Sequence, residues 1–469
     1  MMKSKHDVII VGAGPAGTAT AIQLAIMGLN VAIVERYPFP RTHVGICLSD
    51  RTLALLQYLG LGDEFHQAQF WQRNLTAVSW GRSETQFVPQ PGFHVNRGVL
   101  DQLLLNKAEE AGVSVYQPAQ MLKTQSLKHS GWQMTIEQAG KRQVLTGQFI
   151  VDASGRHSAF RVPTIKDSPS LLAIHAGWEL KIVPEFDGLI ESGEEAWLWY
   201  AQTARDKAVV SVFCDPRHVK SEKHENLQAH YEHLLQQFPL LQPHKMGQQC
   251  TETKACDASS YHSADPISNQ HIRVGDACIS VDPLSSQGVH LALLSALQAA
   301  VVVHTILKKP ENTELAKQFF NIRMTERIKQ FQEKTRNEYS RISIVRPEAF
   351  WHERGGNTKV VEPSITLPPT LSEPAQPHIQ VQLSPDTQIE KSPVLDGVFV
   401  EEQQVLKHPN IDEAVAYLDG VNLIALLSVL PQKLSYAAIP SLWEKQIAPS
   451  QGQKITSWLW EKRILIEAN

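Results

Sequence analysis

Three glycines follow the first apolar segment of the chain at a spacing that suits the binding of a pyrophosphate. Residues 8–11 (VIIV) lead into Gly12, Gly14 and Gly17, and an alanine-rich stretch comes next. The first glycine permits a tight turn, the second lets the backbone approach a phosphate, and the third lets helix and strand pack closely. The N-terminus of the helix would attract the phosphate charge. The pattern therefore predicts a strand, a phosphate-binding turn and a helix.

An acidic residue closes the same unit. Residues 31–34 (VAIV) form a second apolar segment that ends at Glu35. A carboxylate at this place can accept hydrogen bonds from the hydroxyls of an adenosine ribose. The complete strand–turn–helix–strand unit with its acidic end is far more specific than the three glycines alone. It predicts a Rossmann-type dinucleotide site, with a purely structural glycine turn as the alternative.

Two further small-residue turns lie far along the chain and distinguish FAD from a nicotinamide cofactor. Residues 152–156 (DASGR) follow a short apolar segment, and residues 275–276 (GD) follow another one at 272–274. The second turn leads into residues 282–289 (DPLSSQGV). A nicotinamide dehydrogenase needs no additional turns of this kind. The three turns, in this order, predict that the chain binds FAD.

With these motifs, residues 6 to about 345 resemble the p-hydroxybenzoate-hydroxylase-like flavoprotein monooxygenases and their relatives, the flavin-dependent halogenases. The resemblance implies non-covalent FAD, with Asp276 on the ribityl chain and Arg97 beside the cofactor. It also implies that the turn from Pro283 to Val289 presents backbone N–H groups to the flavin pyrimidine edge. The residues expected to contact FAD are Gly12, Gly14, Ala16, Gly17, Glu35, Arg36, Arg41, Gly45, Arg97, Asp152, Gly155, Asp276, Pro283, Gln287, Gly288 and Val289.

Two basic residues are the candidates for catalysis. Residues 40–45 (PRTHVG) resemble the loop along the isoalloxazine ring, where His43 would donate a hydrogen bond or shuttle a proton, unless it is an ordinary loop histidine. Residues 70–81 (FWQRNLTAVSWG) resemble the halogenase segment that holds a lysine, and Arg73 takes its position. A guanidinium stays protonated and cannot replace the neutral amine, which disfavours halogenation. We expect Arg73 to be a solvated arginine, with a role in substrate binding as the alternative.

The resemblance implies an FAD-dependent monooxygenase that hydroxylates an electron-rich aromatic ring through a flavin hydroperoxide. NAD(P)H would be a transient reductant, because no second nucleotide-binding unit is evident in the sequence. The alternatives are a hydroxylase of small phenols or indoles, a halogenase, a prenyl-reductase-like enzyme and a non-catalytic FAD-binding protein. The chain length, the DPLSSQGV turn and the C-terminal tail most resemble the flavoproteins that oxygenate a tryptophan in a polypeptide during quinone cofactor biogenesis.

Length and patterning predict more than one structural unit in the 469 residues. We expect an α/β fold in which residues 1–350 form a glutathione-reductase-like Rossmann FAD domain. A mixed β-sheet substrate domain would be inserted at about 75–100 and 170–265. Recurring prolines predict an extended linker over 351–395. Helical patterning predicts a small helical, winged-helix-like domain over 396–469.

The C-terminal domain is the expected docking place of a protein or peptide partner that carries the aromatic substrate. Exposed aromatic side chains such as Trp443, Trp458 or Trp460 would make the contacts, unless they are core residues. We expect Trp458 and Trp460 to share a face if their segment is a strand. A net charge of −4 gives no reason to expect nucleic acid or an anionic membrane as a partner.

The remaining sequence features predict a metal-free protein of the cytoplasm. The five cysteines are scattered and form no CxxC pair, which argues against a zinc site and against a disulfide framework. The chain starts with a polar stretch that runs directly into the first strand, without an apolar signal region. Residues 291–307 are apolar but include Gln298 and His304, so we expect a buried helix and no stable membrane association.

Overall fold

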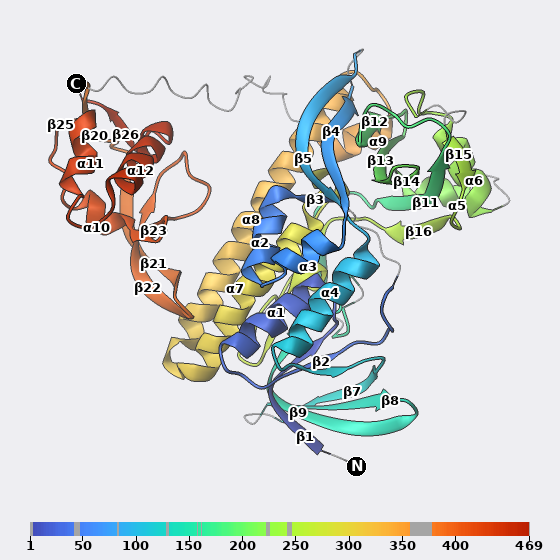
Figure 1. Cartoon of the computed structure of the whole chain (residues 1–469), viewed down its shortest axis with the longest axis horizontal. Helices are drawn as coiled ribbons and strands as arrows, with labels where there is room; N and C mark the ends of the chain where they lie inside the picture. The colour runs from blue at the N-terminus through green and yellow to red at the C-terminus, as the bar shows by residue number, and fades with distance from the viewer. Residues whose placement is uncertain are drawn as a thin grey trace. The chain divides into compact units, whose positions relative to one another are not determined.

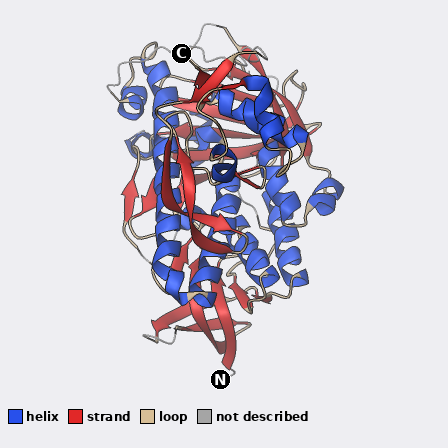
Figure 2. Ribbon diagram, turned by 90° about the vertical axis from the view of Figure 1, so that its left-hand side faces the viewer, coloured by secondary structure: helices blue, strands red, loops and turns tan. Residues whose placement is uncertain are grey.

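The computed structural model divides into two compact units, each with its own hydrophobic core. The first unit contains Met1–Lys309 and Arg327–Lys359, and the second contains Pro310–Glu326 and Val360–Asn469. The division falls within helix α8 (Thr313–Ser343). Helices and strands are mixed throughout, as expected for an α/β fold (Figure 2). The structure describes residues 3–41, 47–81, 84–127, 131–156, 158–160, 162–221, 226–241, 246–356 and 378–468.

A sheet with a parallel core lies at the N-terminal end of the first unit (Figure 1). Its order is β6-β2-β1-β9-β8-β7, with β18 beside β9. The strands β6, β2, β1, β9 and β18 are parallel to one another, whereas β8 and β7 continue the sheet antiparallel. The apolar segments read from the sequence fill β1 and β2 and are buried, as the central strands of a parallel sheet must be. The strands are β1 (Lys3–Val11), β2 (Val31–Val34), β6 (Ser114–Tyr116), β7 (Gln120–Ser126), β8 (Trp132–Gln138), β9 (Lys141–Asp152) and β18 (His271–Arg273).

A second, mixed sheet forms the expected insertion and has two different faces. Its order is β15-β11-β14-β13-β12-β4-β5-β3, with β16 beside β11. One face packs aliphatic side chains against helix α6, and the other packs aromatic side chains against the end of α8 and against α9. The strands are β3 (Cys47–Ser49), β4 (Trp71–Ser79), β5 (Gln86–His94), β11 (Leu172–Leu180), β12 (Gly188–Ser192), β13 (Ala196–Ala204), β14 (Lys207–Cys214), β15 (Met246–Gln249) and β16 (Lys254–Asp257).

The helices of the first unit include one that is long and apolar enough to cross a membrane, α7 (Gly288–Lys308). Because 72% of its most apolar window is buried inside the protein and it packs against α1, it is a core helix, as expected. The other elements are α1 (Pro15–Ile26), α2 (Asp50–Tyr58), α3 (Gly62–Gln67), α4 (Arg97–Glu110), α5 (Pro216–Ser221), α6 (Leu227–Leu235), α9 (Ala349–Gly355), the 3-10 turns η3 (Gly275–Ala277) and η4 (Pro283–Ser285), and the small sheet of β10 (Thr164–Lys166), β17 (Tyr261–Ser263) and β19 (Ile279–Ser280). The 3-10 turn η5 (Pro310–Asn312) belongs to the second unit.

The second unit contains more strand than its helical patterning predicts. A hairpin and a small sheet surround three short helices, and Trp443 lies at the centre of the core. The elements are β20 (Gln380–Leu383), β21 (Gln388–Asp396), β22 (Phe399–Lys407), β23 (Tyr417–Leu418), β24 (Val421–Asn422), α10 (Leu423–Leu427), β25 (Leu434–Ser435), η6 (Tyr436–Ala438), α11 (Ile439–Leu442), α12 (Pro449–Glu461) and β26 (Leu465–Glu467).

The secondary structure differs from the expected extended linker over 351–395 at both of its ends. The first residues belong to helix α9, and the last belong to strands β20 and β21. Pro393 does not exclude β21, because β22 is the one partner of β21 among the described residues and a two-stranded hairpin leaves each strand a free edge, where proline is tolerated. Residues 357–377 lie outside the described part of the chain.

The C-terminal tryptophans also differ from the sequence-based prediction. Trp458 and Trp460 lie on helix α12 and not on a strand, so they do not share a face. Trp443 is fully buried, and its Nε1 donates to the Leu426 carbonyl oxygen at 3.0 Å. Trp460 is partly buried and packs edge to face on Tyr436. Trp443 is therefore a core residue and cannot be a docking residue.

Candidate functional site

The carboxyl ends of four strands bring the predicted cofactor residues to one edge of the first sheet. Val11 at the end of β1 pairs with Val34 of β2 on one side and with Asp152 of β9 on the other, and Asp152 pairs with Arg273 of β18. The chain leaves these strands through all three glycine-containing turns and through Glu35. Ligands of open α/β sheets bind outside the carboxyl ends of the strands.

The glycines of the first turn stand where a side chain would collide with backbone. Gly12 has φ +103°, and a Cβ there would lie 2.4 Å from the carbonyl oxygen of Ala153. A Cβ on Gly17 would lie 1.9 Å from the Gly12 carbonyl oxygen. At Gly14 the nearest atom to a Cβ is the end of the Arg41 side chain, at 3.3 Å. Gly12 and Gly17 thus allow the turn to form, whereas Gly14 leaves the backbone open at the N-terminus of α1.

A buried network of charges lies beside this turn. Glu35 is 3% exposed and accepts the Ala13 N–H at 2.8 Å. Arg41 lies 3.5 Å from Glu35 and 3.3 Å from Asp101. Asp101 is fully buried on helix α4 and also accepts from Arg97, at 3.0 Å. The structure therefore joins three predicted residues through Asp101, which sequence reasoning missed and whose signal was its position four residues after Arg97.

The third turn packs directly on the first helix. Gly275 has φ +56°, and a Cβ there would lie 2.8 Å from the Ala16 side chain. Its neighbour Asp276 points its half-exposed carboxylate toward Arg156, with Oδ2 3.6 Å from Nε. The packing of Gly275 on Ala16 places the predicted ribityl-binding residue, Asp276, at the N-terminal end of α1.

The second turn has one buried and one open residue. Asp152 is fully buried and accepts hydrogen bonds from Ser154 and Ser158, so it holds its own loop in shape. Gly155 has φ +76°, and no atom lies within 4 Å of a Cβ built there. The loop thus exposes its backbone next to the glycine turn.

The turn from Pro283 to Val289, here called the flavin turn, contains η4 and the start of helix α7. Ser286 has the left-handed conformation (φ 50°) and precedes Gln287, the N-cap of α7. Around Gly288 the space for a Cβ is empty. The first N–H groups of a helix have no partner within the helix. Pro283 has no N–H, and the Gln287 N–H donates to Ser285 Oγ at 3.3 Å, so the donors that this turn can offer to a cofactor are the N–H groups of Gly288 and Val289.

These residues fit FAD. The edge offers open backbone at Gly14, Gly155 and Gly288, two helix N-termini, and a buried carboxylate at Glu35. Each oxygen of Glu35 accepts one backbone N–H in the structure, and a carboxylate oxygen has room for a second hydrogen bond, such as one from a ribose hydroxyl. Arg36 is exposed and its guanidinium lies over Tyr37, away from the network of Glu35. His43 and Gly45 lie outside the described residues.

Arg73 is buried, so the expectation of a solvated arginine is wrong. It is 4% exposed, its Nε donates to the Gln90 carbonyl oxygen at 2.9 Å, and its Nη1 donates to Cys47 Sγ at 2.6 Å. Burial raises the pKa of the Cys47 thiol, while the Arg73 charge and a hydrogen bond with Ser286 oppose the rise. Cys47 thus connects Arg73 to the flavin turn.

A buried hydrogen-bond chain ends at the start of the same turn. Trp197 Nε1 donates to Tyr339 Oη, and Tyr339 Oη donates to Asp282 Oδ2, each at a distance of 3.1 Å. Asp282 also accepts the Leu284 N–H at 2.9 Å. Burial raises the pKa of Asp282 from its ordinary 3.8 to about 6. Sequence reasoning missed Trp197 and Tyr339, because they come from a strand and a helix far from the turn in sequence.

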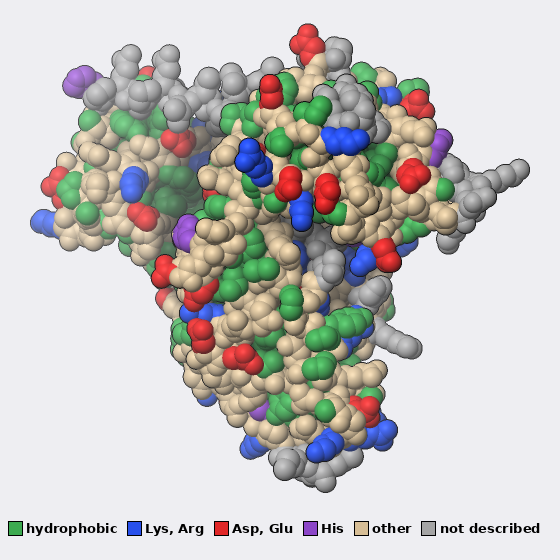
Figure 3. Space-filling view, turned by 45° about the vertical axis from the view of Figure 1, so that its right-hand side comes forward, with side chains coloured by type: hydrophobic (Ala, Val, Ile, Leu, Met, Phe, Trp, Pro, Cys, Tyr) green, Lys and Arg blue, Asp and Glu red, His purple; other side chains and the backbone are tan. Residues whose placement is uncertain are grey.

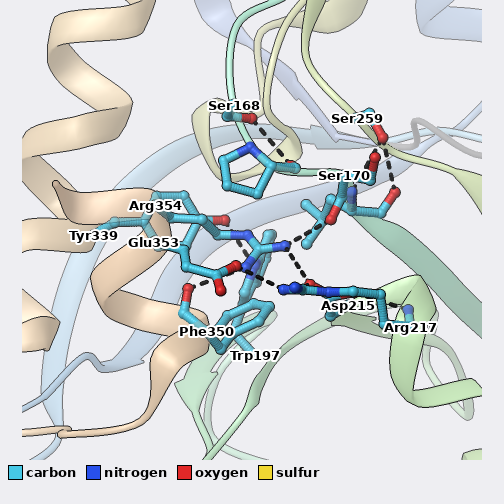
Figure 4. A network of polar contacts seen from close by, with 12 residues as sticks. Ser168, Ser170, Trp197, Asp215, Arg217, Ser259, Tyr339, Phe350, Glu353 and Arg354 are labelled. Carbon is cyan, nitrogen blue, oxygen red and sulfur yellow. Dashed lines mark hydrogen bonds and ion pairs between the residues drawn. The ribbon is translucent and has the colours of Figure 1, made fainter. Parts of the chain in front are cut away.

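Arg354 of helix α9 organises the polar contacts next to this chain (Figure 4). Its Nη2 donates to the Ser170 carbonyl oxygen at 2.6 Å, and its guanidinium lies 3.9 Å from the centre of the Phe350 ring. A small hollow, partly open to solvent, is lined by Arg354, Asp282 and Tyr339 together with polar groups of α8. The start of the flavin turn is therefore backed by ordered polar groups and by a small open hollow.

The chain belongs to the FAD binding domain family, whose pattern matches residues 5–323. The fold and the site define a flavoprotein of the FAD monooxygenase and halogenase superfamily, which confirms the expected α/β fold and the resemblance. A tryptophan 2-halogenase of Chondromyces crocatus is 26% identical over 339 residues, which cover 68% of this chain. The chain spans 65% of that halogenase, just under two thirds of its length.

Two solved structures match nearly the whole chain. A flavin-dependent halogenase covers 100% of this chain with a TM-score of 0.81, and its 19% identity shows the fold alone. A peptidyl tryptophan dihydroxylase essential for tryptophylquinone cofactor biogenesis has a TM-score of 0.72 and 25% identity. That match covers 98% of this chain and 99% of the dihydroxylase. The likeness thus includes the second unit.

Proposed function

We propose that the protein is an FAD-dependent monooxygenase that hydroxylates a tryptophan side chain within a polypeptide during the biogenesis of a quinone cofactor. FAD, when bound and reduced, activates dioxygen. One oxygen atom enters the aromatic ring in place of hydrogen, the other leaves as water, and NAD(P)H supplies the two electrons. The support from relatives is the match of the peptidyl tryptophan dihydroxylase over 98% of the chain.

The observation that favours hydroxylation over halogenation is that Arg73 is buried. By the resemblance to the halogenases, Arg73 occupies the position of the lysine that a halogenase needs as a neutral amine. Arg73 is enclosed by the Gln90 carbonyl and by Cys47, and a guanidinium in such a place remains a cation and a hydrogen-bond donor. The arginine is suited to fix the sheet edge next to the flavin turn and does not provide a nucleophilic nitrogen.

A protein-borne substrate is supported by the second unit, which carries none of the predicted FAD residues. Its surface exposes apolar side chains, among them Val429 (45% exposed) and Leu442 (42%), which replace Trp443 as candidates for docking. The surface shown in Figure 3 mixes acidic and basic side chains and has no continuous field of one sign. This face gives no support to nucleic acid as the partner.

The test offers the FAD-loaded enzyme a library of short peptides with one tryptophan each, together with NAD(P)H, a flavin reductase, chloride and bromide. We expect a mass increase of one oxygen, which moves by two further mass units under ¹⁸O₂. The same library with phenylalanine in place of tryptophan is the matched control. A halogen isotope pattern would contradict hydroxylation, and rapid oxygenation of free tryptophan without any peptide product would contradict the protein-borne substrate.

A further inference from the structure

His94, on the last residue of β5, has a buried hydrogen-bond acceptor that no group in the described part of the chain uses. His94 is 1% exposed, and its Nδ1 lies 2.8 Å from the Gln202 carbonyl oxygen. Because a carbonyl oxygen only accepts, Nδ1 carries the proton. Burial, reinforced by the charge of Arg73, lowers the pKa of His94 to about 4, so the ring is neutral at pH 7. Its Nε2 is left with a lone pair and no partner.

The sheet register places this histidine on the face that reaches the flavin turn. His94 pairs with Cys47 of β3 on one side and with Trp71 of β4 on the other. Side chains of paired residues project to the same face, and so does that of Arg73, two residues after Trp71. Cys47 bonds both Arg73 and Ser286, and Ser286 belongs to the flavin turn. The acceptor therefore belongs to the sheet face next to the predicted isoalloxazine position.

The surroundings of His94 define the chemistry of a partner for Nε2. A buried acceptor without a partner has lost its hydrogen bond to water, so a donor group is expected there when the site is filled. The neighbouring guanidinium of Arg73 disfavours a cationic donor. Trp199 packs edge to face against His94, with ring centres 6.3 Å apart, and provides an aromatic wall. A neutral, flat ring with an N–H group meets these three conditions.

We propose that His94 Nε2 accepts the indole N–H of the substrate tryptophan and orients the ring beside the flavin. This inference rests on the proposed function, and it makes His94 the residue that decides which ring edge turns toward the cofactor. Arg73 then has a defined role, because its charge adds to the burial that keeps His94 neutral and its contact with Cys47 holds the sheet edge that carries His94.

Binding of two ring analogues to the FAD-loaded enzyme tests the proposal without turnover. 3-Methylindole has the N–H group, and 3-methylbenzothiophene has nearly the same shape without it. Titration is followed by the change in flavin absorbance. We expect the wild type to bind 3-methylindole about tenfold more tightly, as the loss of one buried hydrogen bond predicts. His94→Phe should bind both analogues equally, and His94→Gln, whose amide oxygen is an acceptor, should retain part of the preference.

Equal affinities in the wild type, an unchanged preference in His94→Phe, or no binding of 3-methylindole would each overturn the proposal. Equal affinities would mean that water takes the Nε2 position. The flavin absorbance spectrum of each variant reports whether the fold and the cofactor are retained, and His94→Gln serves as the second variant if His94→Phe does not fold. Oxygen insertion is measured separately, so a halogenated product would refute the proposed function while an N–H preference that depends on His94 would still stand.

Discussion

Replacing Asp101 with Asn should destabilise the first unit far more than any exposed charge change on the same helix. Asp101 is fully buried and its two oxygens serve Arg97 Nε at 3.0 Å and Arg41 Nη2 at 3.3 Å. Removing one partner of a buried ion pair costs about 3–5 kcal/mol, because the remaining charge is left unpaired. Arg41 is 21% exposed and water compensates it in part. We therefore expect a loss of about 3 kcal/mol, at the lower end of this range.

The assay is urea unfolding of the FAD-loaded protein, followed by the fluorescence that flavin gains on release. The matched control is Glu110→Gln, which removes an exposed ion pair with Lys107 on the same helix. That pair is worth about 0–1 kcal/mol. Asp101→Asn should lower the midpoint strongly with an unchanged slope, and Glu110→Gln should hardly move it. If the two variants shifted the midpoint equally, the charge network of Glu35, Arg41, Asp101 and Arg97 would not be what stabilises the edge of the first sheet where the predicted FAD residues lie.

Three further outcomes are expected. The raised pKa of Asp282 (about 6) means that the folded state binds its proton more tightly, so the stability from this carboxyl is complete below about pH 4 and is lost as the pH rises through about 6. Asp282→Asn, whose side-chain oxygen can still accept from Tyr339, should thus gain stability over the wild type at pH 8 but not at pH 4 in urea unfolding, and a difference independent of pH would refute this. Arg73→Lys should yield no halogenated product by mass spectrometry, because a lysine alone does not provide a binding site for the halide; a chlorinated or brominated product would contradict the assignment. Leu442→Glu, next to the core residue Trp443, should reduce modification of a whole partner protein severalfold while free peptides are modified as before, and an equal effect on both would exclude a docking role for this surface.

A deletion of residues 396–469 would be a poor test of docking. It would remove β22, the partner of β21, and β25 and β26, the partners of β20. It would also uncover the segment of α8 that belongs to the second unit, where Arg323 pairs with Glu413 at 3.0 Å. A buried surface exposed in this way destabilises the remaining protein. Single surface substitutions such as Leu442→Glu avoid that confusion.

The sequence by itself determined the cofactor class, because the motifs of a nucleotide turn are local. Gly12 and Gly17 are required by steric contacts within or beside one strand–turn–helix unit, and Glu35 follows from the same unit. Apolar runs also predicted the buried strands β1 and β2 and several strands of the mixed sheet, since burial on a parallel core or on one face of a mixed sheet leaves a clear pattern. The proline-rich segment was misread in part, because a free hairpin edge tolerates proline.

Only the tertiary structure decided which groups surround the flavin turn. Asp101 becomes the centre of a charge network because α4 brings it to Arg41, 60 residues away in sequence. Tyr339 reaches Asp282 across 57 residues, and His94 reaches Gln202 across 108. Such contacts depend on strand register and helix packing, which no local pattern encodes. Burial is likewise a property of the whole fold. It encloses Arg73, which the sequence alone left as a possible surface cation. It also leaves His94 Nε2 without a hydrogen-bond partner among the described residues.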